Sequence, residues 1–350
     1  MTTIHKGDTV LVTGATGYIG SHVVEELLAA GYKVRGTSRT KDKAAYLTDL
    51  MDKKFGEGKL EIAEVPDMIA DDAYTDAVKG VSGIVHLASV VTFSSDPDAV
   101  FPPTVKGTLN ILKAASTEPA VKSIVYTSSS TAALSPVANE KIIVTKDTWN
   151  DAAVERVRTS DSPNAYGKSD KRRHLERYML IKDNPDVYSA SKTEAEKALW
   201  AAVKSTNPPF QVAAVLPSCN YGTRFRETGN STADWVIGTY TGKDKSLSHF
   251  PPQYFINVSD DAKLHVAALI DPACKGERIF GFTAPQSYNH LLAVFRKLEP
   301  GKDFGEDVDI GEDLSQVPNK EAEELLRKHY GHGFVSLEET VKQCIAPVVT

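Results

Sequence analysis

The chain has 350 residues, a length that fits one large domain or two of ordinary size. Its 40 Lys and Arg residues against 46 Asp and Glu residues give a net charge of −6, which argues against a protein that binds the nucleic-acid backbone. Three widely spaced cysteines exclude a disulfide scaffold and a cysteine-rich zinc site. No apolar run approaches the roughly 18 residues of a membrane span, and the polar N-terminus shows no signal peptide. We expect a cytoplasmic protein with no membrane and no nucleic-acid partner.

The N-terminal part alternates short apolar runs with helical stretches. Strands are predicted at residues 9–13, 32–37, 60–65, 83–87 and 123–127, with helices at 21–30, 72–79 and 105–115. Gly31 is expected to end the first helix in the left-handed conformation. Strands that are apolar throughout and alternate with helices predict an α/β fold with a doubly wound parallel sheet of the Rossmann type.

The chain changes character at about residues 150–186, which are charged and rich in turn-forming residues. This segment predicts a solvated insertion that either bulges to the surface or overhangs a substrate entrance. Its basic cluster at residues 171–174 leaves a nucleic-acid patch as the alternative. A helix at 189–202 and a sixth strand at 211–216 follow, and the pattern is irregular from residue 217 on. We predict a first domain at residues 1–216 and a smaller C-terminal lobe at 217–350, with some strands returning to the main sheet.

A glycine-rich turn, Thr-Gly-Ala-Thr-Gly-Tyr-Ile-Gly at residues 13–20, joins the first strand to the first helix. Glycine allows a tight turn, close approach of a pyrophosphate, and close packing of helix on strand. The helix N-terminus adds free N–H groups and partial positive charge. The context predicts a dinucleotide site, although a simple glycine-rich turn is the alternative. The expected contacts are Gly14, Thr16, Gly17, Tyr18, Ile19 and Gly20.

The end of the second strand indicates which dinucleotide binds. The carboxylate that would hold the ribose 2′-hydroxyl of NAD is missing there, and Arg39 follows the strand instead. A planar guanidinium suits a 2′-phosphate, and Thr37, Ser38 and Lys43 are expected to assist. The sequence therefore predicts NADPH/NADP+, with an ordinary surface arginine as the alternative.

Five segments occur in an order typical of one enzyme superfamily. They are residues 13–20, Val-His-Leu-Ala-Ser at 85–89, Pro-Thr-Val-Lys-Gly-Thr-Leu-Asn at 103–110, Thr-Ser-Ser at 127–129 and Tyr-Ser-Ala-Ser-Lys at 188–192. Together they resemble the extended short-chain dehydrogenase/reductase superfamily. More narrowly, they are similar to its dihydroflavonol-4-reductase-like branch and to NADPH-dependent microbial aldehyde (carbonyl) reductases. The resemblance spans most of the chain and is densest over residues 9–222.

The last two segments carry the expected chemistry. A phenol has an unperturbed pKa of about 10, and a lysine four residues later on the same helix face lowers it. The resemblance implies that Ser129 binds the substrate carbonyl, Tyr188 donates the proton, and Lys192 binds the nicotinamide ribose. Ser128, the next residue along the extended chain, should then point away from the substrate.

Two other tyrosines compete with Tyr188. Tyr178 has a lysine at the same spacing, but the chain breaks at Asp-Asn-Pro directly after that lysine. Tyr166 is followed four residues later by Asp170 instead of a lysine. Since the pair has to stand on one continuous helix, we favour Tyr188.

Further contacts are expected around these motifs. Asp67 is predicted to accept a hydrogen bond from the adenine amino group, with Met68 against the ring, although a plain helix N-cap is compatible with Asp67. The other cofactor contacts are Leu87, Ala88, Ser89, Thr127, Pro217, Ser218 and Asn220. The candidate pocket residues are Val91, Phe93, Ser130, Tyr221, Trp235, Phe250 and Gln253, with ordinary packing as the alternative for each. His86 is expected to be a core residue, Asn257 structural, and no metal site is predicted.

The sequence thus predicts NADPH-dependent reduction of aldehydes and ketones to chiral alcohols by hydride transfer. The expected partner is a small-molecule carbonyl substrate, and the chain is expected to be a monomer or homodimer. One alternative is a sugar-nucleotide epimerase or dehydratase, which usually has asparagine where Thr104 stands and a basic diphosphate clamp in its C-terminal lobe. Another is a regulator that binds NADP(H) without catalysis.

Overall fold

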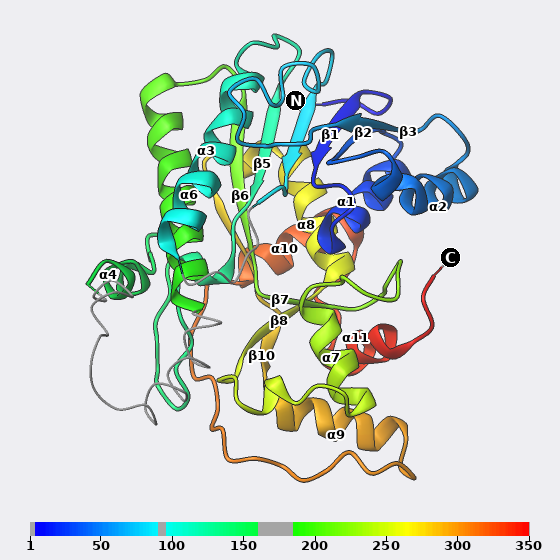
Figure 1. Ribbon diagram of the computed structural model, residues 1–350, viewed down its shortest axis with the longest axis vertical. Helices are drawn as coiled ribbons and strands as arrows, with labels where there is room; N and C mark the ends of the chain where they lie inside the picture. The colour runs from blue at the N-terminus through cyan, green and yellow to red at the C-terminus, as the bar shows by residue number, and fades with distance from the viewer. Residues whose placement is uncertain (1–3, 90–95, 160–184, 350) are drawn as a thin grey trace.

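The computed structural model describes residues 4–89, 96–159 and 185–349, and a seven-stranded parallel sheet forms its centre (Figure 1). The strands follow the order β3 (Leu60–Glu64), β2 (Lys33–Ser38), β1 (Thr9–Thr13), β4 (Gly83–His86), β5 (Ser123–Thr127), β6 (Gln211–Pro217) and β9 (Arg278–Gly281). The predicted Rossmann-type sheet is confirmed. The strand order reverses between β1 and β4, which is where such sheets bind their ligands.

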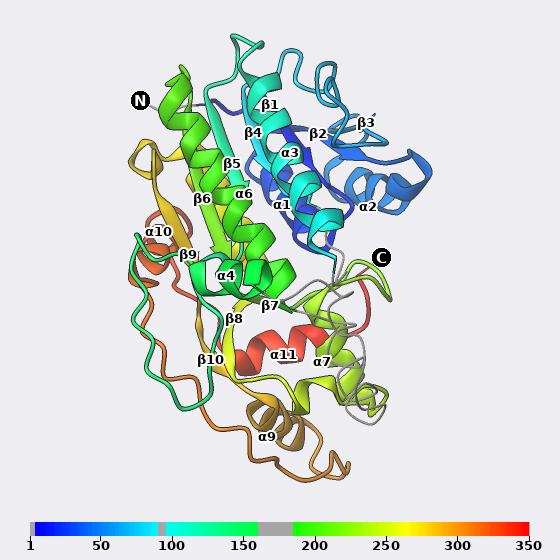
Figure 2. The same ribbon diagram turned by 60° about the vertical axis from the view of Figure 1, so that its left-hand side comes forward.

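Helices cover both faces of the sheet (Figure 2). One face carries α3 (Pro97–Ala115) and α6 (Pro185–Thr206), with α4 (Asp151–Thr159) packed beside α6. The other carries α1 (Tyr18–Ala29) and α8 (Val258–Ile270), flanked by α2 (Ala45–Phe55) and α10 (Lys320–Tyr330). Val10 and Val12 of β1 pack toward the α1 side, and Leu11 packs toward the α3 side. The central strands β1, β4, β5 and β6 are mostly apolar because both of their faces are buried.

A second, smaller sheet lies below the first in Figure 1. Its strands are β10 (Ala284–Gln286), β8 (Gln253–Asn257) and β7 (Cys219–Tyr221), and α7 (Thr232–Thr241), α9 (Tyr288–Leu298) and α11 (Leu337–Ile345) pack around it. We call this part the small lobe. The chain after residue 217 is not confined to it, because α8, β9 and α10 return to the main sheet.

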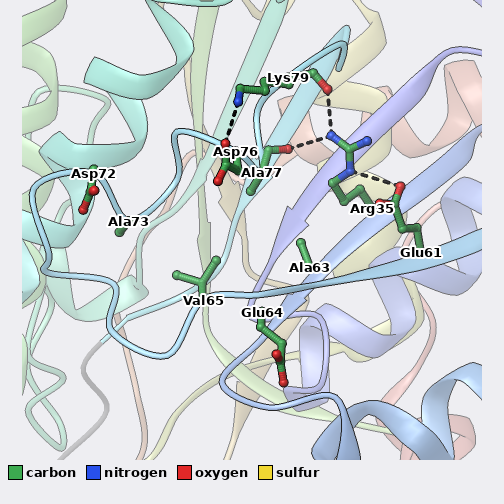
Figure 3. A pocket seen from close by; sticks show the side chains of 10 residues that line it. All are labelled: Arg35, Glu61, Ala63, Glu64, Val65, Asp72, Ala73, Asp76, Ala77 and Lys79. Atoms are coloured by element: carbon green, nitrogen blue, oxygen red, sulfur yellow. Dashed lines mark hydrogen bonds and ion pairs between the residues drawn. The ribbon is translucent and has the colours of Figure 1, made fainter.

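The six predicted strands are present, and each end agrees to within one residue. Gly31 also follows α1 with a φ of 91°, as expected. The predicted helix at 72–79 is wrong, because this segment is a series of turns. The Arg35 guanidinium binds two carbonyls of this segment: its Nη1 donates to Ala77 (3.0 Å) and Lys79 (2.7 Å). These residues line one side of a surface pocket (Figure 3).

The helix α3 begins eight residues before its predicted start at Val105, with Pro102 and Pro103 inside it. The hydroxyl of Thr104 donates to the Val100 carbonyl at 2.7 Å, which gives one carbonyl near these prolines a side-chain partner. The strand β9 was not predicted, because it has only four residues and begins with the charged Arg278.

In the described ranges, no helix is long and apolar enough to cross a bilayer. The same ranges contain no group of three histidine, cysteine or acidic side chains that could hold a metal ion. Cys219, Cys274 and Cys344 are free and buried. The pocket candidates Val91 and Phe93, the competing Tyr166 and Tyr178, and the basic cluster at 171–174 lie outside the described residues.

Candidate active site

The turn between β1 and α1 is a cradle that side chains would fill. Gly14 has a φ of 67°, and a Cβ built on it would lie 3.1 Å from the Ala88 nitrogen. A Cβ on Gly17 would lie 3.2 Å from the Gly14 oxygen, and one on Gly20 only 2.3 Å from it. The three glycines therefore allow the helix to start against the strand and leave the backbone open to a phosphate.

Two threonines fix the shape of this cradle. The Thr13 hydroxyl accepts hydrogen bonds from the N–H groups of Leu87 (3.1 Å) and Ala88 (3.0 Å), joining β1 to the end of β4. The Thr37 hydroxyl accepts one from the Gly14 N–H at 3.1 Å. Thr37 was predicted to assist phosphate binding, and its hydroxyl, which accepts this bond, still has its own hydrogen to donate.

Polar groups without partners face the region around the cradle. Gly17 occupies the N-cap position of α1 and gives it no side-chain cap. Among the described residues, the buried hydroxyls of Ser38 and Ser89, at the ends of β2 and β4, have no hydrogen-bond partner. An uncapped helix N-terminus and unsatisfied hydroxyls at the switch point of the sheet fit a dinucleotide. The Tyr18 ring is 5% exposed and packs into the small lobe, and among the described residues its buried hydroxyl also has no hydrogen-bond partner.

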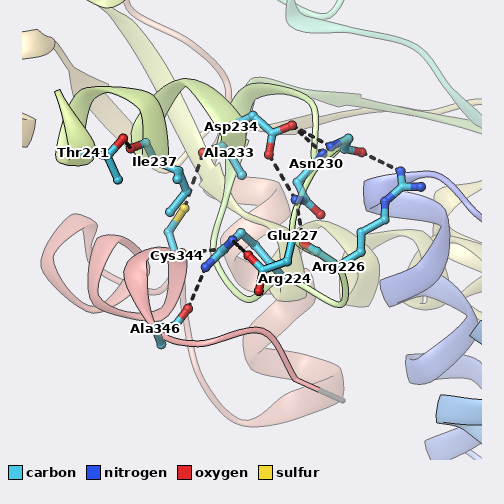
Figure 4. A network of polar contacts seen from close by, with 11 residues as sticks. Arg224, Arg226, Glu227, Asn230, Ala233, Asp234, Ile237, Thr241, Cys344 and Ala346 are labelled. Atoms are coloured by element: carbon cyan, nitrogen blue, oxygen red, sulfur yellow. Dashed lines mark hydrogen bonds and ion pairs between the residues drawn. The ribbon is translucent and has the colours of Figure 1, made fainter. Parts of the chain in front are cut away.

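Three cationic side chains come from segments beside the cradle. Arg39 and Lys43 are exposed. Arg226 comes from the loop before α7, and its guanidinium lies 5.6 Å from the ring centre of Tyr46, whose hydroxyl donates to the Thr16 carbonyl at 3.0 Å (Figure 4 shows this loop). Arg226 was missed because it lies 187 residues after Arg39, in a segment with no regular pattern.

The loop after β3 is fixed against α3. Asp67 accepts a hydrogen bond from the Ile69 N–H at 2.9 Å, so it caps a turn, and the helix N-cap interpretation is wrong. A Cβ on Gly107 would lie 2.1 Å from the Met68 methyl group, so this methyl group occupies the place that only glycine leaves open. Asn110 donates to the carbonyls of Met68 (3.1 Å) and Ala70 (2.7 Å).

Ser129, Tyr188 and Lys192 meet where β5 ends against α6. The Ser129 hydroxyl is hydrogen-bonded to that of Tyr188, which lowers the pKa of the phenol, while burial raises it more strongly. The Lys192 ammonium donates to the Thr127 carbonyl at 2.9 Å. Burial lowers the pKa of Lys192 to about 8. Lysine was expected to lower the pKa of Tyr188, but burial raises this pKa overall, and the opposing contribution comes from Ser129.

The two serines after β5 have different partners. The Ser128 hydroxyl donates to Glu196 at 2.6 Å, two helical turns beyond Tyr188. The Ser129 hydroxyl accepts from the hydroxyl of Thr131 at 3.0 Å and its N–H at 3.3 Å, and it is the serine that contacts Tyr188. Ser128 therefore points away from the tyrosine, as expected.

Residues 10–279 match the sequence profile of the NAD-dependent epimerase/dehydratase family. This chain belongs to that family. It is 39% identical to aldehyde reductase 2 of Sporidiobolus salmonicolor, over 97% of this chain and 96% of the relative. It is 33% identical to the ketoreductase adrE of Penicillium rubens, over 98% and 97% of the two chains.

The crystal structure of Gre2 from Candida albicans in complex with NADPH superposes on this family member with a TM-score of 0.76. The match has 25% identity and covers 96% of this chain and 97% of that one. Vestitone reductase from alfalfa has the same fold, with a TM-score of 0.72 at 23% identity over 97% of each chain. The predicted superfamily and its reductase branch are confirmed.

The residues expected to form the pocket of this family member fall into two groups. The rings of Trp235 and Phe250 stack at 5.2 Å and are half-buried, as Ser130 and Gln253 are. Tyr221 is fully buried, stacks on Phe255, and its hydroxyl accepts a hydrogen bond from Gln286 at 2.9 Å. The structure thus places Tyr221 in the small-lobe core, away from any exposed pocket wall.

The segment after β6 is also buried. Pro217 ends β6, and the Ser218 hydroxyl donates to the Tyr254 carbonyl. The side-chain oxygen of Asn220 is buried without a partner among the described residues, so it remains an acceptor for a ligand group. Asn257 caps α8 through the Ser259 N–H and donates to Thr340 and Gln343 of α11, which is the structural role expected of it.

Two histidines of this family member are buried and uncharged. Burial lowers the pKa of His86 to about 3 and that of His22 to about 4. His86 shares a hydrogen bond of 2.8 Å with the Thr13 hydroxyl, and His22 stacks on Phe225 and bonds to the Thr223 carbonyl. Both are core residues.

We expect the free energy of unfolding to fall as the pH decreases from about 6.5. The folded-state pKa of each histidine is depressed, so below pH 6.5 the unfolded chain binds more protons than the folded one. Each should contribute about 1.4 kcal/mol per pH unit. Urea denaturation at pH 7, 6 and 5 measures the slope. His22→Phe, which keeps a ring against Phe225, should halve it, and an unchanged slope would contradict the assignment.

Proposed function

We propose that this chain reduces aldehydes and ketones to alcohols with NADPH, and that Tyr188 donates the proton. The observation that carries the proposal is the convergence of Ser129, Tyr188 and Lys192 at the carboxyl edge of the sheet, next to the glycine cradle. The names of the relatives support it, since they include an aldehyde reductase and ketoreductases, and Gre2 of Candida albicans was solved in complex with NADPH.

When bound, NADPH supplies a hydride to the carbonyl carbon. The chain's own residues hold and move the proton: Ser129 donates a hydrogen bond to the carbonyl oxygen, and the Tyr188 hydroxyl transfers its proton to that oxygen. One ammonium hydrogen of Lys192 is bonded to Thr127, which leaves two for the nicotinamide ribose. Ser129 and Lys192 are buried, and low exposure to water strengthens their electrostatic interactions.

We assign the cofactor site to the cradle and the strand ends around it. Backbone groups from Gly14 to Gly20 bind the pyrophosphate, and Arg39 with Lys43 binds the 2′-phosphate. The remaining proposed contacts are Asp67, Met68, Leu87, Ala88, Ser89, Thr127, Pro217, Ser218 and Asn220. The proposed nucleotide-binding unit consists of residues 1–216 together with α8, β9 and α10, and the small lobe lines the substrate side.

Arg39→Ala is expected to raise the dissociation constant of NADPH by about tenfold to a hundredfold, the loss of one charge-assisted interaction with phosphate. The constant for NADH should change little, because NADH has no 2′-phosphate. Fluorescence titration with both cofactors measures the effect. Lys33→Ala is the matched control, since it removes a positive charge at the opposite end of β2. Equal losses for both cofactors would remove Arg39 from the phosphate site.

A panel of aldehydes, α-keto esters and aryl ketones tests the activity. Loss of NADPH absorbance with one or more members supports the reductase. A protein that binds NADPH but oxidises it with no carbonyl compound would instead be a nucleotide-sensing regulator. Thr104 stands at the position where the epimerase branch usually has asparagine, and its hydroxyl donates to the Val100 carbonyl within α3.

We also infer that the protein acts in the cytoplasm as a monomer or homodimer. The three free, buried cysteines support a reducing compartment. Size-exclusion chromatography with light scattering measures the mass in solution, and a higher oligomer would contradict the inference.

A further inference from the structure

A buried ion pair lies behind the catalytic residues. Glu196 is on α6, one turn after Lys192 and two turns after Tyr188, and it is fully buried. One carboxylate oxygen accepts hydrogen bonds from Arg278 Nε (2.7 Å) and Trp200 Nε1 (3.1 Å). The other accepts from Ser128 (2.6 Å) and Arg278 Nη2 (3.2 Å). The carboxylate is therefore fully hydrogen-bonded and fixed in orientation.

The partner arginine is equally well held. Arg278 is 7% exposed, and its Nη1 donates to the carbonyls of Lys146 (2.8 Å) and Thr148 (2.7 Å). Its guanidinium lies 3.9 Å from the ring centre of Trp149. Burying two charges costs more than their attraction returns unless every polar atom finds a partner. The Glu196–Arg278 pair meets this condition, and it joins α6, β9 and the end of β5 at one point.

The Lys192 ammonium needs a counter-charge, because it is 3% exposed. The titratable groups around it are Tyr188 and Glu196 on its own helix, His86 on β4 and Tyr126 on β5. Burial lowers the pKa of His86 to about 3 and raises that of Tyr126, so both are neutral. Among the described residues, Glu196 supplies the negative charge near this lysine.

We infer that Glu196, oriented by Arg278, is a positioning residue for the proposed reduction: its carboxylate holds Lys192 in the charged state and ties the Ser128–Ser129 turn to α6. The inference rests on the proposed function. Glu196 touches neither substrate nor cofactor, and it acts through Lys192 and through the serine next to Ser129.

The test is the pH dependence of kcat/KM. Glu196→Gln removes the negative charge and leaves Arg278 positive, so protons leave both Lys192 and Tyr188 more easily. The alkaline limb of the profile, along which kcat/KM falls as these protons are lost, should move to lower pH by about one unit. Arg278→Gln leaves the Glu196 charge without its partner, and the limb should move to higher pH. Shifts in opposite directions in the two variants indicate an electrostatic role. Loosened packing would not make the direction of the shift depend on which charge is removed.

Two controls accompany these variants. Ser128→Ala removes the hydrogen bond but keeps both charges, so kcat should fall several-fold with an unchanged limb. NADPH titration and thermal unfolding verify that each variant is folded. If Glu196→Gln does not fold, the double variant Glu196→Gln with Arg278→Met removes both buried charges together. It should still move the alkaline limb to lower pH, because Glu196 is one turn from Lys192.

The inference is overturned if the alkaline limb of kcat/KM stays at the wild-type pH in folded Glu196→Gln. It is also overturned if the limb shifts in the same direction in both single variants. An inactive wild-type protein on the whole carbonyl panel would instead contradict the proposed function. The two failures are therefore separate.

Discussion

Tyr188→Phe is expected to lower kcat by about 10³-fold, the usual contribution of a positioned acid. The change removes the hydroxyl that Ser129 contacts and leaves the ring in place, so the proton donor is lost without a cavity. The dissociation constant of NADPH should stay within about twofold, since the cradle and Lys192 are untouched. Stopped-flow measurement of NADPH oxidation with an active carbonyl substrate, together with fluorescence titration, gives both quantities.

Tyr178→Phe is the matched control, because Tyr178 has the same Tyr-x-x-x-Lys spacing and lies in the segment before α6. It should keep wild-type turnover. Full activity in Tyr188→Phe with a loss in Tyr178→Phe would reverse the assignment of the proton donor.

Gly20→Ala is expected to have the largest effect on the cofactor site itself. Its Cβ would lie 2.3 Å from the Gly14 oxygen, and this neighbour is backbone, which cannot rotate aside. The helix α1 would have to move away from β1, at a cost of about 3 kcal/mol or more in the free energy of unfolding. The same movement distorts the phosphate cradle, so NADPH binding should be lost.

Gly301→Ala serves as the control, since a Cβ there meets no atom within 4 Å and the backbone does not require glycine. Urea denaturation and NADPH titration compare the two variants. Wild-type stability and affinity in Gly20→Ala would contradict the close helix–strand packing described above.

The central strands of the sheet were predictable because they are short apolar runs whose two faces are both buried. Two elements differ from the prediction. The segment at 72–79 forms turns, and its Ala77 and Lys79 carbonyls accept hydrogen bonds from Arg35, more than 40 residues away in sequence. The early start of α3 was hidden by Pro102 and Pro103, which normally precede a helix or open it.

The candidate site was predictable where one segment carries the signal. Tyr188 and Lys192 are four residues apart, and the three glycines lie within the seven residues 14–20. Contacts between distant segments were missed, such as Glu196 with Arg278 and Thr37 with Gly14. Each of these residues alone reads as an ordinary surface or strand residue, and only the fold brings the partners together. Glu196 is fully buried and lies one turn after Lys192, but no residue near it in the sequence indicates that it is buried.

Tyr18 begins the helix that follows the glycine turn, yet its ring is buried in the small lobe, and His22 one turn later stacks on Phe225. These side chains therefore join the main sheet to the small lobe at the place where the pyrophosphate is proposed to bind. Separating them as rigid bodies would expose an aromatic side chain, at a cost of about 2 kcal/mol for that ring alone. Rigid-body separation of the main sheet from the small lobe is therefore less favourable than movement that keeps this ring buried.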